Sequence, residues 1–172
     1  MTLSSELSSD SRPKRVPLAT REPLAHLALN GRPHLLVDHL LAVGELAGSF
    51  AARFGAEAWG RLAGRWHDLG KYSDSFQHRI RTENGFEAHL ETLDVKERDH
   101  SSAGALRALQ LGQSAVPLAF VIAGHHAGLS DRSRLLKERL PAKEHLLKEV
   151  SVRADPSILE GILHTQPVIA AD

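Results

Sequence analysis

Apolar residues recur every three or four positions between Leu35 and Gly55, and this spacing constrains the fold more than any other feature of the sequence. It places one apolar stripe along a helix, and Gly55 is a natural end for that helix. A second stripe runs through residues 56–70 and ends at Gly70. No segment shows the alternating β-branched residues of a strand. The sequence therefore predicts an all-α fold, with a first stripe made of Leu36, Leu40, Val43, Leu46, Ala47, Phe50 and Phe54.

Capping and helix-breaking residues divide the rest of the chain into further helices. Ser73 is a suitable N-cap for a helix through Ile80, and residues 82–98 are polar and loop-like. Proline is favoured in the first turn of a helix and stops a helix that has already begun. These signals predict helices that begin at Asp99 or Ser101, at Pro117, at Ser130 or Asp131, after Pro141 and at Asp155-Pro156.

The length of 172 residues suits one domain with a hydrophobic core. Residues 1–30 are rich in Ser, Pro and Arg and lack periodicity, so we expect a flexible segment at 1–30 and the domain at 31–172. No stretch approaches about 18 consecutive apolar residues, and the N-terminus lacks an apolar signal region. We therefore expect no membrane partner and a cytoplasmic location.

Histidine is abundant and cysteine is absent. The chain has 11 histidines and no cysteine, so any metal must be held by imidazole and carboxylate groups. Its 21 basic residues balance 21 acidic ones, whereas proteins that bind nucleic acid through bulk electrostatics have a basic excess. Any contact with nucleic acid must therefore be local, metal-mediated or supplied by a partner.

Ligand-type side chains gather at the ends of otherwise apolar predicted helices. Each has an ordinary alternative: a lone histidine on a helix is commonly a hydrogen-bonded or surface residue, and a lysine at a helix C-terminus is favourable there. Polar residues at the end of an apolar stripe are nevertheless costly to bury unless they are engaged. Together they indicate a site for a transition metal, with candidate residues His39, His67, Asp68, Lys71, His100, His125 and His126.

At these positions the sequence resembles the HD phosphohydrolase superfamily. More closely, it is similar to the HD nuclease domain of the nuclease-helicase that serves type I CRISPR surveillance complexes. Among these, it most resembles subtype I-C. The resemblance spans about residues 26–140. It is carried by the segments VDHLLAVGELAGSFAARFG, LAGRWHDLGKYSDSFQHRI, DHSSAGALRAL and AFVIAGHHAGLSD.

The resemblance implies an HD-domain helical bundle with one or two divalent ions bridged by Asp68. The expected ligands of a first ion are His39, His67 and Asp68, and those of a second are Asp68, His100, His125 and His126. Asp68 and Lys71 are the expected catalytic residues, and Lys71 would steady a phosphate or an activated water. Histidine-rich ligation favours Mn, Fe, Co or Ni over Mg. The implied activity is cleavage of single-stranded DNA during interference against invading DNA, with a helicase domain or subunit and a surveillance complex as partners.

The sequence departs from the family pattern in one respect. The superfamily has a last aspartate ligand on a later helix, and Asp131, Asp155 and Asp172 do not fit its expected context. We therefore expect the domain to be incomplete at its C-terminus. Two alternatives stay open: an HD-type phosphohydrolase that acts on nucleotides, and an inactive docking fragment.

Overall fold

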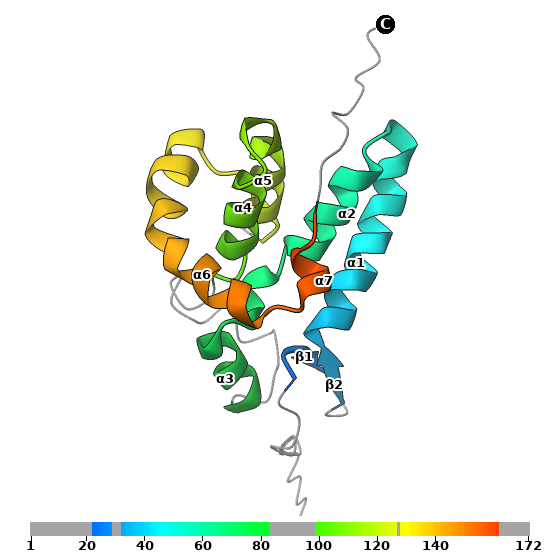
Figure 1. Ribbon diagram of the computed structural model, residues 1–172, viewed down its shortest axis with the longest axis vertical. Helices are drawn as coiled ribbons and strands as arrows, with labels where there is room; N and C mark the ends of the chain where they lie inside the picture. Colours follow the sequence, from blue (N-terminus) through cyan, green and yellow to red (C-terminus); the bar gives the residue numbers. More distant parts are fainter. Residues whose placement is uncertain (1–21, 29–31, 83–98, 127, 162–172) are drawn as a thin grey trace, which may run out of the picture.

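The computed structural model describes residues 22–28, 32–82, 99–126 and 128–161. The described residues form a helical bundle with one small two-stranded sheet at its lower end (Figure 1). The α-helices are α1 (Leu36–Ala51), α2 (Glu57–Trp66), α3 (Asp74–Thr82), α4 (Ser102–Leu109), α5 (Val116–Gly124), α6 (Glu144–Arg153) and α7 (Pro156–Leu159). Short helices are η1 (Ala52–Phe54), η2 (Leu69–Tyr72), η4 (Gln113–Ala115), η5 (Arg134–Arg139) and η6 (Pro141–Lys143).

Helices α1 and α2 form a tightly packed hairpin (Figure 1). The turn between them ends at Gly55, whose φ of 73° lies in the left-handed region that favours glycine. Glycine also permits the close approach of the helices, because a Cβ on Gly64 would lie 2.5 Å from the carbonyl oxygen of Val43. The hairpin brings the start of α1 beside the end of α2. His39 and His67 are thereby placed at the same end of the pair.

A second hairpin, formed by α4 and α5, packs against α2 and carries the other candidate ligands. His100 lies two residues before the start of α4, and His125 directly follows α5. Pro117 occupies the first turn of α5, as the sequence predicts. Trp66, at the end of α2, is fully buried in the centre of the core, and its Nε1 donates a hydrogen bond of 2.8 Å to the carbonyl oxygen of Ile158. This bond ties α7 to the end of α2, which His67 directly follows.

The helix boundaries follow the predicted capping signals closely. Asp99 rather than Ser101 supplies the side-chain cap of α4, by accepting a hydrogen bond of 3.0 Å from the backbone N–H of Ser102. Asp131 likewise accepts from the backbone N–H groups of Ser133 and Arg134 at the start of η5, and Asp155 caps α7. The predicted loop at 82–98 lies almost entirely outside the described residues. The all-α fold class is confirmed.

A small two-stranded sheet accompanies the helices, although the sequence carries no alternating strand signal. Strands β1 (Leu24–Leu27) and β2 (Pro33–Leu35) pair antiparallel. Leu24 and Leu27 are buried against α3, and Gln77 of α3 exchanges two hydrogen bonds with the backbone of Leu24, of 2.8 and 2.9 Å. Strands of four and three residues are too short to display alternation, and tertiary contacts rather than propensity hold them.

The strand β1 also lies within residues 1–30, the range expected to be flexible. Residues 22–28 are part of the folded body, whereas 1–21 lie outside the described residues. The division of the chain at residue 30 therefore stays a prediction. Among the described helices, none has both the length and the apolar character needed to cross a membrane.

Candidate metal centre

Asp68 lies at the centre of the candidate site, with only 3% of its surface exposed. It follows α2 at the start of the short helix η2, where the backbone leaves the helical conformation. Its Oδ2 lies 3.4 Å from His39 Nε2 and 3.2 Å from His67 Nε2. These three residues form a first donor group, whose ligand atoms lie within 4.8 Å of one another.

The other oxygen of the same carboxylate faces the second helical hairpin. Asp68 Oδ1 lies 3.3 Å from His100 Nε2 and 3.4 Å from His125 Nε2. The ring of His126 lies 4.9 Å from that of His100. A second donor group, again with ligand atoms within 4.8 Å of one another, comprises Asp68, His100, His125 and His126. All six predicted ligands thus converge on one place, and their binding of metal stays a prediction.

Backbone carbonyl groups fix the orientation of two of the histidines. His67 Nδ1 lies 2.6 Å from the carbonyl oxygen of Gly64, and His125 Nδ1 lies 2.7 Å from that of Ile122. A carbonyl oxygen only accepts, so each Nδ1 carries the proton and donates it. In the neutral ring, Nε2 then keeps its lone pair and directs it at Asp68. Lone pairs that face a carboxylate need a cation or a proton between them.

His100 provides a second indication that a cation belongs here. Both of its ring nitrogens and Asp68 Oδ1 are buried without a hydrogen-bond partner among the described residues. Unsatisfied buried polar atoms are costly and rare in folded proteins. Burial also lowers the pKa of His100 to about 4, so the imidazole is neutral at physiological pH and able to ligate. The donor set therefore fits a divalent ion of the kind that prefers imidazole and carboxylate ligands.

The charge state of Asp68 and His67 agrees with this interpretation. Burial alone would raise the pKa of Asp68, but the surrounding histidines and Lys71 outweigh it and hold that pKa well below its ordinary value. Burial would lower the pKa of His67, yet Asp68 and the Gly64 carbonyl raise it overall. Asp68 is therefore an ionised carboxylate. The raised pKa of His67 favours a proton on its Nε2 beside Asp68, so proton and metal compete for the same lone pair.

Lys71 lies behind the carboxylate rather than at the surface. Its side chain is 2% exposed, and its Nζ lies 2.9 Å from Asp68 Oδ2 and donates to the carbonyl oxygen of Ala25 at 3.4 Å. The ordinary alternative of an exposed charge at a helix end therefore does not apply. Lys71 compensates the buried carboxylate, and its predicted role in catalysis stays untested by the geometry.

The sequence missed the residues that hold the second donor group together. Arg139 of η5 donates to the carbonyl oxygen of Ala123 at 3.1 Å and to Ser101 Oγ at 2.8 Å. It also donates to Ser102 Oγ at 3.1 Å and to Asp99 Oδ1 at 3.2 Å. One guanidinium thus joins the segment around His100 to the end of α5. No motif marks Arg139, because its partners lie 16 to 40 positions away in the sequence.

Two histidines of the β-hairpin, also missed, extend the cluster beyond the first donor group. His26 and His34 are cross-strand partners with ring centroids 4.8 Å apart. Their rings lie 6.2 and 5.7 Å from that of His39. Neither belongs to the two donor groups. The high histidine count of the sequence was the one available signal for them.

The remaining aspartates do not complete the site within the described residues. Asp131 accepts backbone hydrogen bonds from Ser133 and Arg134, and Asp155 accepts one of 2.9 Å from Ser157. Both act as helix caps, as the sequence predicts for Asp155. Asp172 lies outside the described residues.

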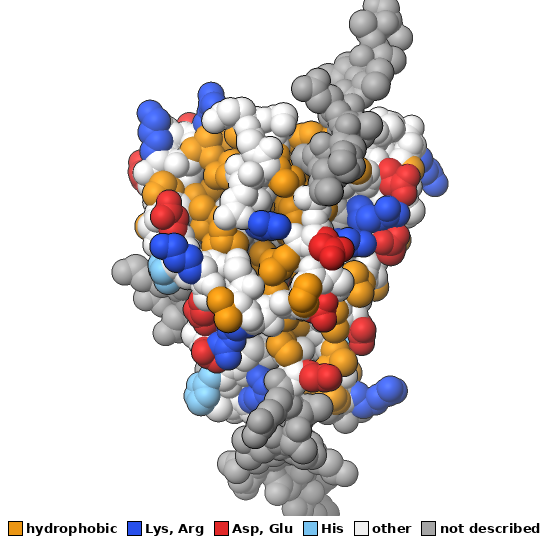
Figure 2. All heavy atoms as spheres, viewed as in Figure 1, with side chains coloured by type: hydrophobic (Ala, Val, Ile, Leu, Met, Phe, Trp, Pro, Cys, Tyr) orange, Lys and Arg blue, Asp and Glu red, His pale blue; other side chains and the backbone are white. Residues whose placement is uncertain are grey.

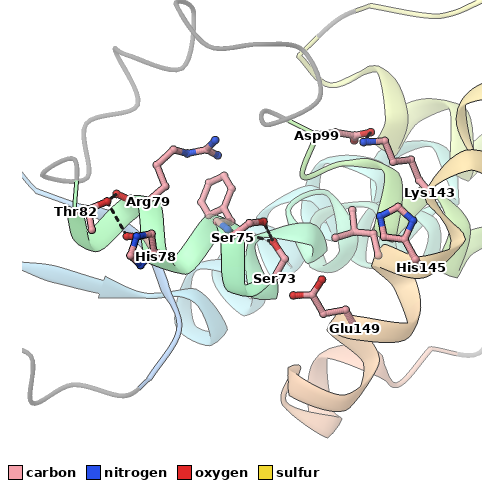
Figure 3. Close-up of a pocket in the computed structure, with 11 residues that line it drawn as sticks. Ser73, Ser75, His78, Arg79, Thr82, Asp99, Lys143, His145 and Glu149 are labelled. Carbon is pink, nitrogen blue, oxygen red and sulfur yellow. Dashed lines mark hydrogen bonds and ion pairs between the residues drawn. The ribbon is translucent and has the colours of Figure 1, made fainter.

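A cavity between α3 and α6 lies apart from these donors (Figure 3). Its volume is about 510 Å³, and its labelled side chains include Ser73, His145 and Glu149. None of the six candidate ligands lines it. The Asp99 side chain, paired with Lys143 at 3.6 Å, stands at its edge.

Comparison with known proteins agrees with the geometry. No curated protein matches the sequence. The HD domain matches residues 36–155, a range that includes α1 to α6 and all six candidate ligands. HD domains are typically metal-dependent phosphohydrolases. The chain belongs to the HD domain family.

Proposed function

We propose that this protein is a metal-dependent nuclease that cleaves single-stranded DNA, as the HD nuclease domain of a type I CRISPR-associated interference system. The observation that carries the proposal is the sharing of Asp68 by two donor groups. A carboxylate whose two oxygens face separate sets of histidines is suited to bridge two ions. Paired ions supply an activated nucleophile and stabilise both the attacking and the leaving oxygen of a phosphodiester.

The chain's own residues have distinct roles in this proposal. The five histidines are neutral ligands and Asp68 contributes the one negative charge, a set that favours Mn, Fe, Co or Ni over Mg. Neither donor group exceeds four protein ligands, which leaves positions for substrate and water. Lys71 neutralises Asp68 from the buried side, so the exposed side of the cluster is left for the phosphate.

Among the described residues, the face of the molecule shown in Figure 2 has no extended basic stripe. Charges of both signs are interspersed on the described surface that faces the viewer in Figure 2, in agreement with a net charge of zero. Binding of DNA through this face would lack the basic stripe of a general nucleic-acid protein. Affinity would then come from the metal centre and from partners, for which we propose a helicase domain or subunit and a surveillance complex.

A substrate panel tests the proposal directly. The protein is incubated with Mn, Co, Ni or Mg and offered single-stranded DNA, duplex DNA, deoxynucleoside triphosphates or cyclic nucleotides. We expect single-stranded DNA to be cut in the presence of a transition metal. Hydrolysis of nucleotides alone would establish a nucleotide phosphohydrolase, and metal binding without hydrolysis would establish an inactive docking module.

Two variants show whether any activity belongs to this site. Asp68→Asn removes the bridging charge at nearly constant size, and we expect it to lower cleavage by roughly a thousandfold or more, together with the loss of bound metal. His145→Ala is the matched control, because His145 is exposed and lines the separate cavity. An Asp68→Asn protein as active as the parent would refute the proposed site.

A further inference from the structure

A cavity of about 630 Å³ opens directly onto the second donor group. Its volume lies within the range of roughly 300–1,000 Å³ typical of small-molecule sites. Two candidate metal ligands, His100 and His126, form part of its wall. Further lining residues come from residues 128–131 and from η5, the segment between α5 and α6 in Figure 1. A molecule held here would touch the metal centre on one side.

The charges that line this cavity leave one cation available. Asp99 is engaged by Arg139 and Lys143, and the Asp131 carboxylate accepts two backbone N–H groups. Arg139 is occupied by its four hydrogen bonds. The Arg134 side chain is exposed and, within the described part of the chain, makes no hydrogen bond or ion pair. The cavity thus offers an available guanidinium in addition to the metal donors.

An apolar surface lies in the same cavity wall. Leu129 is 78% exposed, although leucine is usually buried. It follows Gly128, whose φ of 74° makes the turn that leads the chain away from His126. The residues that follow form a π-helix at Arg134–Arg139, a rare geometry that is often found at functional sites. The cavity therefore combines metal donors, an apolar side chain and an available cation.

We propose that this cavity holds the nucleotide next to the scissile phosphate of single-stranded DNA, with Arg134 bound to the following phosphate and Leu129 packed against the sugar or base. The proposal rests on the proposed function, because it assigns one part of the DNA to one wall of the site. A nucleotide within a strand presents anionic phosphates, a sugar and a base, and the cavity lining holds metal donors, an apolar side chain and a guanidinium that suit these groups. Guanidinium groups bind phosphate strongly through paired N–H donors.

The test measures binding by fluorescence anisotropy with a labelled single-stranded oligodeoxynucleotide, in Mn and in EDTA, across a range of salt concentrations. Arg134→Gln is compared with Arg132→Gln, which removes the same charge two positions away from a residue that does not line the cavity. We expect Arg134→Gln to weaken binding about tenfold. The slope of log affinity against log salt concentration should be smaller in magnitude by about 0.7 in this variant, which is the contribution of one phosphate contact in single-stranded DNA. Arg132→Gln should change neither quantity.

A second pair of variants tests the apolar contact. Leu129→Ser should weaken binding, whereas Val152→Ser, at another highly exposed apolar residue outside the cavity, should not. If Arg134→Gln and Arg132→Gln behave alike, the subsite is wrong while the nuclease function stands, provided that the parent cuts DNA. A parent that neither binds nor cuts single-stranded DNA overturns both proposals. Equal metal content in all variants confirms that the metal donors are intact.

Discussion

At the scale of single residues, the centre is organised by one buried carboxylate that has more partners than it has oxygens. The carboxylate oxygens of Asp68 lie within 3.4 Å of four histidine nitrogens and of the Lys71 Nζ. The sequence predicted every one of these residues. It could not show that Lys71 is buried, because a lysine after an HD dipeptide is equally compatible with an exposed helix end. Because Lys71 is buried, its charge compensates the Asp68 carboxylate instead of facing solvent.

Replacement of Lys71 by methionine should therefore alter stability and metal response together. The variant leaves Asp68 as a buried charge without its cation, which costs about 3–5 kcal/mol in metal-free protein. A bound divalent ion restores positive charge next to the carboxylate. We expect the melting temperature to rise more on addition of Mn or Co in Lys71→Met than in the parent, as measured by thermal denaturation. Equal metal-induced increases would show that Lys71 does not compensate Asp68.

His100 predicts how the metal-free protein responds to acid. Burial lowers its pKa from 6.5 to about 4 in the folded state, so the unfolded chain binds more protons between these values. The contribution of neutral His100 to the free energy of unfolding is fully present above pH 6.5. It decreases by about 3 kcal/mol as the pH falls towards 4. Denaturant unfolding in EDTA should show this loss in the parent. The loss should be absent in His100→Gln and unchanged in His145→Gln, and a pH profile of His100→Gln identical to that of the parent would contradict the assignment.

At the scale of elements, helical periodicity and capping residues were sufficient to predict the bundle. The stripe from Leu36 to Phe54 became α1 and η1, and the caps at Asp131 and Asp155 lie where the sequence placed them. The β-hairpin was not predictable, because Gln77 and the buried face of α3 stabilise it from 53 positions away. The same holds for the contacts of Arg139. Periodicity and capping residues specify the individual helices. Contacts between residues far apart in the sequence specify how the helices pack together.

Arg139 should act as a positioning residue for the second donor group. Arg139→Met keeps the length of the side chain but removes the four hydrogen bonds that join Ala123 to the segment around His100. We expect affinity for the ion at the second donor group to fall roughly 10- to 100-fold, the usual cost of losing outer-shell support. Titration with Co, followed by visible absorption, measures it. Lys137→Met is the control from the same helix, exposed and free of these contacts, and identical titrations for the two variants would exclude the positioning role.

At the scale of the whole molecule, the α1–α2 and α4–α5 hairpins and the start of η2 place the candidate ligands close together. Helix α1 and the two residues that follow α2 supply the first donor group, and the residues just before α4 and just after α5 supply the histidines of the second. Sequence periodicity alone places each histidine near a helix end but does not say which ends meet. The grouping came from the resemblance to a known family, and the three-dimensional packing accounts for it. Asp68 is the point at which both hairpins are joined electrostatically.

This arrangement predicts that metal binds in two unequal steps. The second donor group offers four ligands, whereas the first offers three and shares its one carboxylate with the second. An ion at the second group already draws on the charge of Asp68 and repels a further cation nearby. The first group also requires His67 to lose a proton that Asp68 favours, because its pKa is raised. We expect the second group to fill first and the first group to bind at least about tenfold more weakly.

Calorimetric titration with Mn or Co at mildly alkaline pH should resolve these two steps. His39→Ala should remove the weaker step and leave the stronger one, whereas His126→Ala should weaken the stronger step. Acidification should reduce the weaker step first, because the histidine with the raised pKa belongs to that group and His100, with a pKa of about 4, belongs to the other. Two ions of equal affinity in the parent, lost together in both variants, would mean that the donors form one undivided cluster rather than two groups joined through Asp68.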